Sequence, residues 1–152
     1  MKRLAIVFAA LSMFAACKSS KSEAKPAAAT KLPKLGLQID VAGETNVGDA
    51  IMGEGNMIQG ESVGAMQVEI MKTPKSLDEE KSDADMFSPK NLKTETLPDG
   101  WVVTFDNKGS MGANYFVTVR RDIAGKSYKC STTGSEPEQA KAVLAACKSL
   151  RP

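Results

Sequence analysis

Residues 101–130 read WVVTFDNKGSMGANYFVTVRRDIAGKSYKC, and three parts of this stretch favour β-structure. Trp101, Val103 and Phe105 occupy alternate positions, so their side chains share one face of a strand. Residues 115–119 are all aromatic or β-branched, which predicts a second strand. An Asp-Ile-Ala-Gly turn then leads into a third strand at the end of the stretch. Strands joined by such short turns predict an antiparallel sheet.

Shorter runs on both sides extend the predicted sheet. Apolar residues alternate with polar or small ones over residues 35–41, where Leu37, Ile39 and Val41 share one face. Turn residues, glycine above all, separate the runs that follow. The remaining strands are expected at residues 47–52, 57–59, 66–71 and 91–97.

Two capping boxes predict two helices. Ser76 is followed three residues later by Glu79, and the helix that begins there should end near Phe87, before a proline. Ser135 and Glu138 have the same spacing, and apolar residues recur at helical spacing after them, at Ala140, Val143, Leu144, Cys147 and Leu150. The predicted fold class is therefore α+β: a twisted antiparallel β-sheet with a mid-chain helix and a C-terminal helix packed on it.

The N-terminus has the pattern of an export signal. A basic start at residues 1–3 precedes an apolar run from Leu4 to Ala16. These thirteen residues would span about 20 Å as a helix, which is short of the roughly 30 Å hydrocarbon core of a bilayer. We therefore do not expect the run to be a permanent transmembrane helix.

The apolar run ends Phe14-Ala15-Ala16-Cys17, which resembles the lipobox of bacterial lipoproteins. Two small residues precede the cysteine, as in that family, and Phe14 stands where a leucine-like residue is usual. The resemblance implies a signal peptide at residues 1–16 and a Cys17 that carries lipid, palmitate included, as the mature N-terminus. Ordinary secretion is the alternative, but cleavage after Ala16 would put bulky Phe14 where a small residue is required.

Residues 17–34 are interpreted as the lipidated cysteine and a flexible tether. After Cys17 they read KSSKSEAKPAAATKLPK, which contains no aromatic residue and little apolar surface to bury. Five lysines against one glutamate give the tether a net charge of +4, which favours an anionic lipid surface or simply keeps a linker solvated. A single globular domain is expected at residues 35–152, long enough for one hydrophobic core.

The predicted domain is acidic. Its thirteen basic and seventeen acidic residues give a net charge of −4, which argues against binding of nucleic acid. The layout of a tethered N-terminus, an antiparallel sheet and a closing helix is similar to that of PsbP-like domains. The resemblance implies a helper or binding domain without catalysis, and it assigns no role to any single residue.

The cysteines predict a disulfide, and the lack of histidine excludes several kinds of catalytic and metal site. Cys130 and Cys147 form a pair in an exported chain, so a disulfide is predicted between them, with two buried thiols as the alternative. The sequence contains no histidine. Its absence excludes Ser-His and Cys-His nucleophile pairs, and any zinc site that needs imidazole.

Two stretches contain residue types that could form a ligand-binding, metal-binding or catalytic site. Residues 43–71 are rich in glycine and hold four methionines, so a small-ligand carrier or a soft-metal carrier such as a Cu(I) protein is one alternative. Turns and core packing explain the same residues. Residues 78–85 hold five carboxylates, which either form a solvated helix face or supply a hydrolase, whose two acids would face each other across a cleft.

The sequence therefore predicts a membrane-anchored lipoprotein of the bacterial cell envelope with a non-catalytic binding or structural domain. Its expected partners are the lipid bilayer, through acylated Cys17, and an envelope protein. No catalytic residue, metal site or cofactor is expected. If the host has two membranes, the resemblance favours the outer one, because Lys18 replaces the aspartate that retains many lipoproteins at the inner membrane. The small-ligand or metal carrier and the carboxylate-based hydrolase stay as alternatives.

Overall fold

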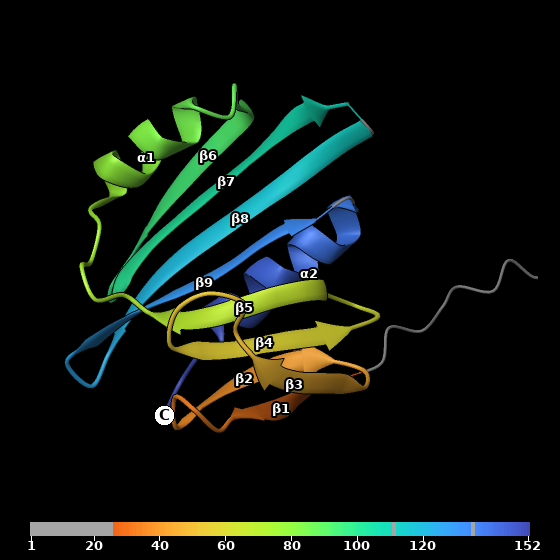
Figure 1. Cartoon of the computed structure of the whole chain (residues 1–152), viewed down its shortest axis with the longest axis vertical. Coiled ribbons are helices and arrows are strands. Elements are labelled where there is room, and N and C mark those ends of the chain that lie inside the picture. The colour runs from red at the N-terminus through yellow and green to blue at the C-terminus, as the bar shows by residue number, and fades with distance from the viewer. Residues whose placement is uncertain (1–25, 111, 135) are drawn as a thin grey trace, which may run out of the picture.

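The computed structural model of the chain describes residues 26–110, 112–134 and 136–152 (Figure 1). The expected signal peptide and Cys17 lie outside these residues. The helices are α1 (Leu77–Asp85) and α2 (Pro137–Lys148), and no helix in the described ranges has the length and apolarity needed to cross a membrane. The strands are β1 (Ala27–Leu32), β2 (Leu37–Ala42), β3 (Thr45–Asp49), β4 (Gly55–Gly60), β5 (Gly64–Ile70), β6 (Lys90–Leu97), β7 (Gly100–Gly109), β8 (Gly112–Ile123) and β9 (Lys126–Gly134).

Strands β3 to β9 form one seven-stranded antiparallel sheet in the order β3-β4-β5-β9-β8-β7-β6. The chain builds β3, β4 and β5 as one meander and then crosses through α1 to the far edge of the sheet. It returns through β6, β7 and β8 until β9 pairs with β5 (Figure 1). The strands β1 and β2 form a separate hairpin. The predicted α+β class, with a mid-chain helix and a C-terminal helix packed on an antiparallel sheet, is confirmed.

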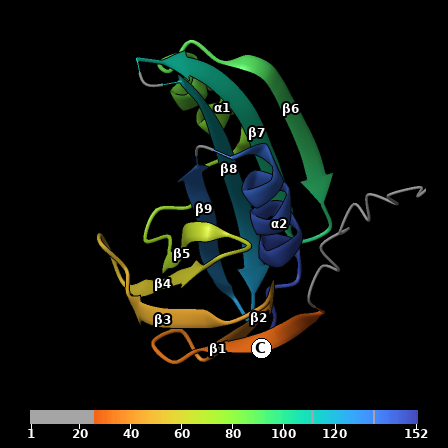
Figure 2. The same ribbon diagram turned by 90° about the vertical axis from the view of Figure 1, so that its right-hand side faces the viewer.

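Alternation along the strands gives the sheet two different faces. In β7, Trp101, Val103 and Phe105 belong to one apolar cluster, and Val102 belongs to the other, as the alternation predicts. The larger cluster is the main core, in which the apolar stripe of α2 and the β1–β2 hairpin pack on the sheet. Figure 2 shows α1 and α2 on opposite sides of the sheet. One face is thus closed by α2, and the other is only partly covered by α1.

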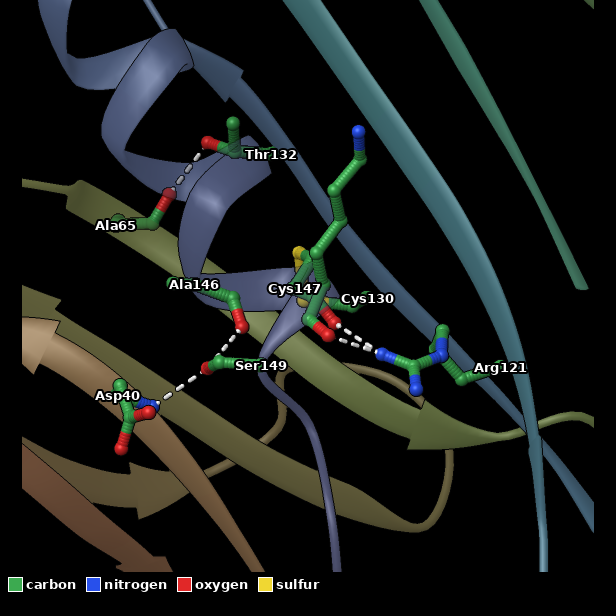
Figure 3. Close-up of a disulfide and its surroundings, with 9 residues drawn as sticks. Asp40, Ala65, Arg121, Cys130, Thr132, Ala146, Cys147 and Ser149 are labelled. Carbon is green, nitrogen blue, oxygen red and sulfur yellow. Dashed lines mark hydrogen bonds between the residues drawn. A yellow bond between two sulfur atoms is a disulfide. The ribbon is translucent and has the colours of Figure 1, made fainter. Parts of the chain in front are cut away.

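A disulfide joins the middle of the sheet to α2. Cys130 of β9 is bonded to Cys147 of α2, with their Cα atoms 5.6 Å apart, and both residues are fully buried (Figure 3). Arg121 of β8 donates hydrogen bonds to the carbonyl oxygens of Cys147 and Lys148, at the helix end where the dipole favours a cation. The structure thus brings the two cysteines together as the sequence predicts.

The C-terminus is fastened to β2. The Ser149 hydroxyl accepts a hydrogen bond from the Asp40 N–H (2.8 Å) and donates one to the Ala146 carbonyl oxygen (2.6 Å; Figure 3). Arg151 lies 2.7 Å from the Asp40 carboxylate, and this hydrogen bond holds the pKa of Asp40 below its ordinary value. The N-terminal hairpin and the C-terminal helix therefore belong to one folding unit.

The expected boundary between tether and domain is wrong. Residues 27–32, expected within the tether 17–34, form β1 and pair with β2 along their whole length. Leu32 is fully buried in the main core. The alanine-rich composition predicts little burial, but backbone hydrogen bonding needs no large side chain and a single leucine supplies the apolar contact. The ordered domain therefore begins before residue 35.

Two predicted element ends also differ from the structure. The strand expected at 47–52 ends at Asp49, and the chain then turns before Gly53, which has a positive φ of 79°. The second helix begins at Pro137 with Glu136 as its N-cap, and no side chain among the described residues caps it. The predicted capping residue, Ser135, lies outside the described residues. Proline is favoured at the first helical position, because its fixed φ suits a helix and the N–H that it lacks would have no partner within the helix.

Candidate binding groove

Helix α1 lies on the sheet face opposite α2, and it is held there at its start. The carbonyl oxygen of Lys75 accepts hydrogen bonds from Trp101 Nε1 (3.2 Å) and Arg120 Nη1 (2.9 Å). Arg120 is in turn oriented by Asp122, 2.8 Å away. Ala84 is the buried residue of α1 and packs with the β7 side chains. The helix therefore covers the β7 end of this face and leaves the rest open.

The predicted capping box at the start of α1 is confirmed. The Ser76 hydroxyl accepts a hydrogen bond from the Glu79 N–H (3.2 Å), and the Glu79 carboxylate accepts one from the Ser76 N–H (2.6 Å). The hydrogen bond from the Ser76 backbone, followed by that from its side chain, holds the pKa of Glu79 below its ordinary value. The Glu79 side chain therefore caps the start of α1.

Three phenylalanines gather beside α1. The rings of Phe105 and Phe116 are stacked, with centroids 4.3 Å apart and planes 10° from parallel. Phe87, which follows α1 in the chain, packs against them with centroids 6.2 Å from Phe105 and 5.4 Å from Phe116. Asn107 donates a hydrogen bond to the Phe87 carbonyl oxygen at 3.0 Å. The aromatic cluster thus ties the end of α1 to β7 and β8.

An open groove of about 440 Å³ extends from the aromatic cluster over the uncovered part of the sheet. Phe105 and Phe116 line it at the β7–β8 end, and Ile51 and Met57 line it at the β4 end. Between them, the side chains of β8, β9 and β5 supply polar groups, among them Thr118, Ser131, Thr133 and Gln67. The groove therefore has two apolar ends and a polar middle, and its volume is in the range of protein ligand sites.

Most charged groups along the groove are paired with one another. Lys129 of β9 lies 3.0 Å from Glu69 of β5, and Lys75 pairs with Asp83 of α1. Glu80 of α1 also lines the groove, and it forms no ion pair with any of the described residues. Lys75, which pairs with Asp83, is also close enough to Glu80 for their charges to interact, so one lysine serves both carboxylates.

Two of the four exposed large hydrophobic side chains of the described residues line this groove, and the other two are their neighbours in the chain. Ile51 and Phe87 line it and are 78% and 49% exposed. Met52 and Met86, their neighbours in the chain, are 73% and 76% exposed. Large exposed apolar side chains beside a groove commonly mark an interaction site. Each end of the groove therefore has exposed apolar side chains close to it.

The methionines of 43–71 lie in different surroundings, although Met57 and Met66 both line the groove. Met66 is buried in the main core and lies opposite Ile58, whereas Met57 occupies the adjacent register position and points to the other face of the sheet. Met52 stands exposed in a turn. Gly55 serves packing, since a Cβ there would lie 2.0 Å from the Val68 carbonyl oxygen. Among the residues with described placement, no three His, Cys, Asp or Glu side chains are grouped to hold a metal ion.

The carboxylates of residues 78–85 have separate roles. Glu79 caps the helix, Asp83 pairs with Lys75, and Glu80 lines the groove. The carboxylate across from them, Glu69 on β5, is paired with Lys129. A hydrolase of the kind considered from the sequence needs two acids free to face a substrate, and three of these four carboxylates are occupied by other contacts.

The groove itself was not predicted from the sequence. Its signals are two short apolar pairs, residues 51–52 and 86–87, each placed beside turn residues rather than inside a regular element. The first pair falls at the end of the strand expected at 47–52 and the second at the expected end of the first helix, and neither position indicates an exposed surface. Apolar residues that flank turns are the sequence feature that indicates such a surface.

Comparison with protein-family models gives no match, and no curated protein sequence matches the chain either. The geometry of the groove and the pattern of the N-terminus are therefore the basis for a functional assignment.

Proposed function

We propose that the protein is a lipid-anchored, non-catalytic lipoprotein of the cell envelope whose domain binds another envelope protein through the groove. Cys17 is the proposed anchor, because the sequence before it resembles a lipobox. The non-catalytic character is supported by the absence of histidine from the sequence and by the engagement of most groove carboxylates in ion pairs or caps. In a host with two membranes we propose the outer one.

The observation that carries the binding function is the presence of exposed apolar side chains at both ends of the groove. Ile51 and Phe87 present apolar surface to solvent at its two ends, and Met52 and Met86 lie beside them. Covering such surface with a partner is favourable by about 25 cal/mol per Å² of apolar area removed from water. Methionine side chains adapt to differently shaped partners, which suits a binding surface.

The position of β1 supports a partner in the aqueous compartment rather than the bilayer. β1 is the described strand nearest to Cys17 in the chain, and it packs in the main core on the α2 side. The groove is lined by the side chains of the opposite face. A chain anchored before β1 therefore enters the described domain at a strand that does not line the groove.

Site-specific photocrosslinking in living cells tests the binding function. With a benzophenone amino acid at Ile51, we expect ultraviolet light to produce one discrete adduct, because this side chain is 78% exposed at the groove. The matched control places the same probe at Lys141 on α2, on the other face, where the side chain is 72% exposed. Identical adduct patterns at the two positions, or no adduct at position 51, would contradict the proposal.

A small-ligand carrier is the second candidate, and the volume of the groove favours it. About 440 Å³ is enough for a ligand of modest size. Trp101 is buried beside Ala84, which lines the groove, so its fluorescence is an intrinsic probe close to the site. Titration with Cu(I) or with small aromatic ligands should change this fluorescence if the protein is a carrier. A flat response across both titrations would remove this candidate.

A further inference from the structure

We infer that the segment received by the groove is basic and apolar: a peptide stretch of the partner that sets apolar side chains against the phenylalanine cluster and a lysine or arginine against Glu80. This inference rests on the proposed binding function of the groove and specifies its occupant. Two features of the groove carry it, the distribution of charge along α1 and the order of apolar and polar side chains in the groove.

The carboxylates of α1 outnumber the cations beside them, because Lys75, which pairs with Asp83, also lies near Glu80 and Glu79. Asp83 pairs with Lys75, and Asp78 lies 3.4 Å from Lys81. Glu79 accepts two hydrogen bonds from Ser76. Glu80 lines the groove, is only half-exposed, and forms no ion pair with the described residues. A half-buried carboxylate is stabilised by an opposite charge. A cationic side chain of the partner would therefore interact favourably with Glu80.

The cations along the groove do not offer a matching site for an acidic segment. Lys129 already lies 3.0 Å from Glu69, and Lys75 already pairs with Asp83. An acidic partner would have to break one of these pairs and leave a carboxylate uncompensated close to its own charge. Like charges placed together are unfavourable, so the groove discriminates against acidic segments.

The apolar ends and polar middle of the groove fit an extended or helical peptide. The stacked rings of Phe105 and Phe116, with Phe87 beside them, offer an apolar surface for a bulky side chain. The Thr118 and Ser131 side chains in the middle can donate to or accept from a peptide backbone. Apolar anchors, backbone contacts and one ion pair together define a short basic, apolar segment.

Binding of two matched peptides to the mature protein, purified from membranes in a non-ionic detergent, tests this inference. The probes are Ac-KKLFLKK-amide and Ac-EELFLEE-amide, which carry the same apolar residues and the same neutral dye, so partition into neutral micelles is comparable. Fluorescence anisotropy measures both affinities. We expect the lysine peptide to bind more tightly, and its affinity to fall as salt rises from about 0.05 M to about 0.5 M, because salt screens exposed ion pairs.

Variants assign the effect to the groove. Glu80→Gln should weaken binding of the lysine peptide about threefold to fivefold and reduce the salt dependence, because one partly exposed ion pair contributes at most about 1 kcal/mol. Glu80→Lys should weaken it further by repulsion. Glu138→Gln is the matched control, since Glu138 lies on α2 behind the other face and is exposed. Ile51→Ser changes an exposed groove residue and should weaken both peptides.

The outcomes separate the inference from the proposed function. If Ac-EELFLEE-amide binds as tightly as Ac-KKLFLKK-amide, or if Glu80→Gln behaves like Glu138→Gln, the occupant is not a basic segment. The groove function still stands in that case when Ile51→Ser weakens binding. If Ile51→Ser also behaves like Glu138→Gln, both the inference and the proposed groove are wrong. Thermal melting of each variant by circular dichroism ensures that only folded proteins are compared.

Discussion

Replacing both Cys130 and Cys147 by alanine is expected to lower the free energy of unfolding by about 2–5 kcal/mol. The two cysteines are 17 residues apart, and their bond connects β9, in the middle of the sheet, to α2. Both side chains are fully buried, so alanine is preferred to serine, whose hydroxyl would be desolvated in the core. The domain should remain folded, because α2 keeps its apolar stripe and the Arg121 contacts at its end.

Urea unfolding of the oxidised wild type and the double variant measures this loss, and hydrogen exchange locates it. Exchange should accelerate first in α2, because the bond that holds this helix to the sheet is gone. Thiol labelling of the denatured, unreduced wild type provides the control: only Cys17, if it is not modified, should react. Reaction of Cys130 and Cys147 in that state, or equal unfolding free energies, would contradict a stabilising bridge.

Replacing Leu32 by alanine is expected to cost about 2–5 kcal/mol, as for other fully buried leucines. Leu32 ends β1, pairs with Leu37 of β2 and is buried in the main core. The substitution removes apolar side-chain atoms from the main core and leaves a cavity. The expected loss is large for a segment whose composition is typical of a linker.

Lys31→Ala is the matched control, since Lys31 is the exposed neighbour of Leu32 in the same strand. Its unfolding midpoint in urea should stay close to that of the wild type. If Leu32→Ala and Lys31→Ala had equal midpoints, β1 would contribute nothing to the core, and residues 17–34 would act as the flexible tether expected from composition. If only Leu32→Ala lowers the midpoint, any truncation that removes residues 27–34 should destabilise the domain.

The parts of the fold that follow from local pattern were predictable. Alternation placed Trp101, Val103 and Phe105 on one face, and the spacing of Ser76 and Glu79 located the start of α1. The stripe on the last helix pointed Cys147 toward the sheet, where Cys130 meets it. Each of these signals lies within a few residues of the feature it predicts, so tertiary context had little opportunity to override it.

The parts that depend on distant pairing were not predictable. β1 is formed because β2 offers a complete antiparallel partner, and no property of Ala27-Ala28-Ala29 indicates that partner. The groove depends on the crossover of α1, which places Phe87 against Phe105 and Phe116 at one end while Ile51 stands at the other. Register and crossover are set by the whole sheet, and single-sequence patterns carry little information about them.

Mass spectrometry of the protein purified from membranes decides whether the domain is a lipid-anchored one. We expect the mature chain to begin at Cys17, with the mass of a diacylglyceryl group on that residue, because the sequence from Phe14 to Cys17 resembles a lipobox. The wild-type protein should fractionate with membranes and Cys17→Ser should lose the lipid mass. A mature N-terminus at Lys18 or Thr30, or an unmodified Cys17, would contradict the anchor and with it the proposed place of this protein in the cell envelope.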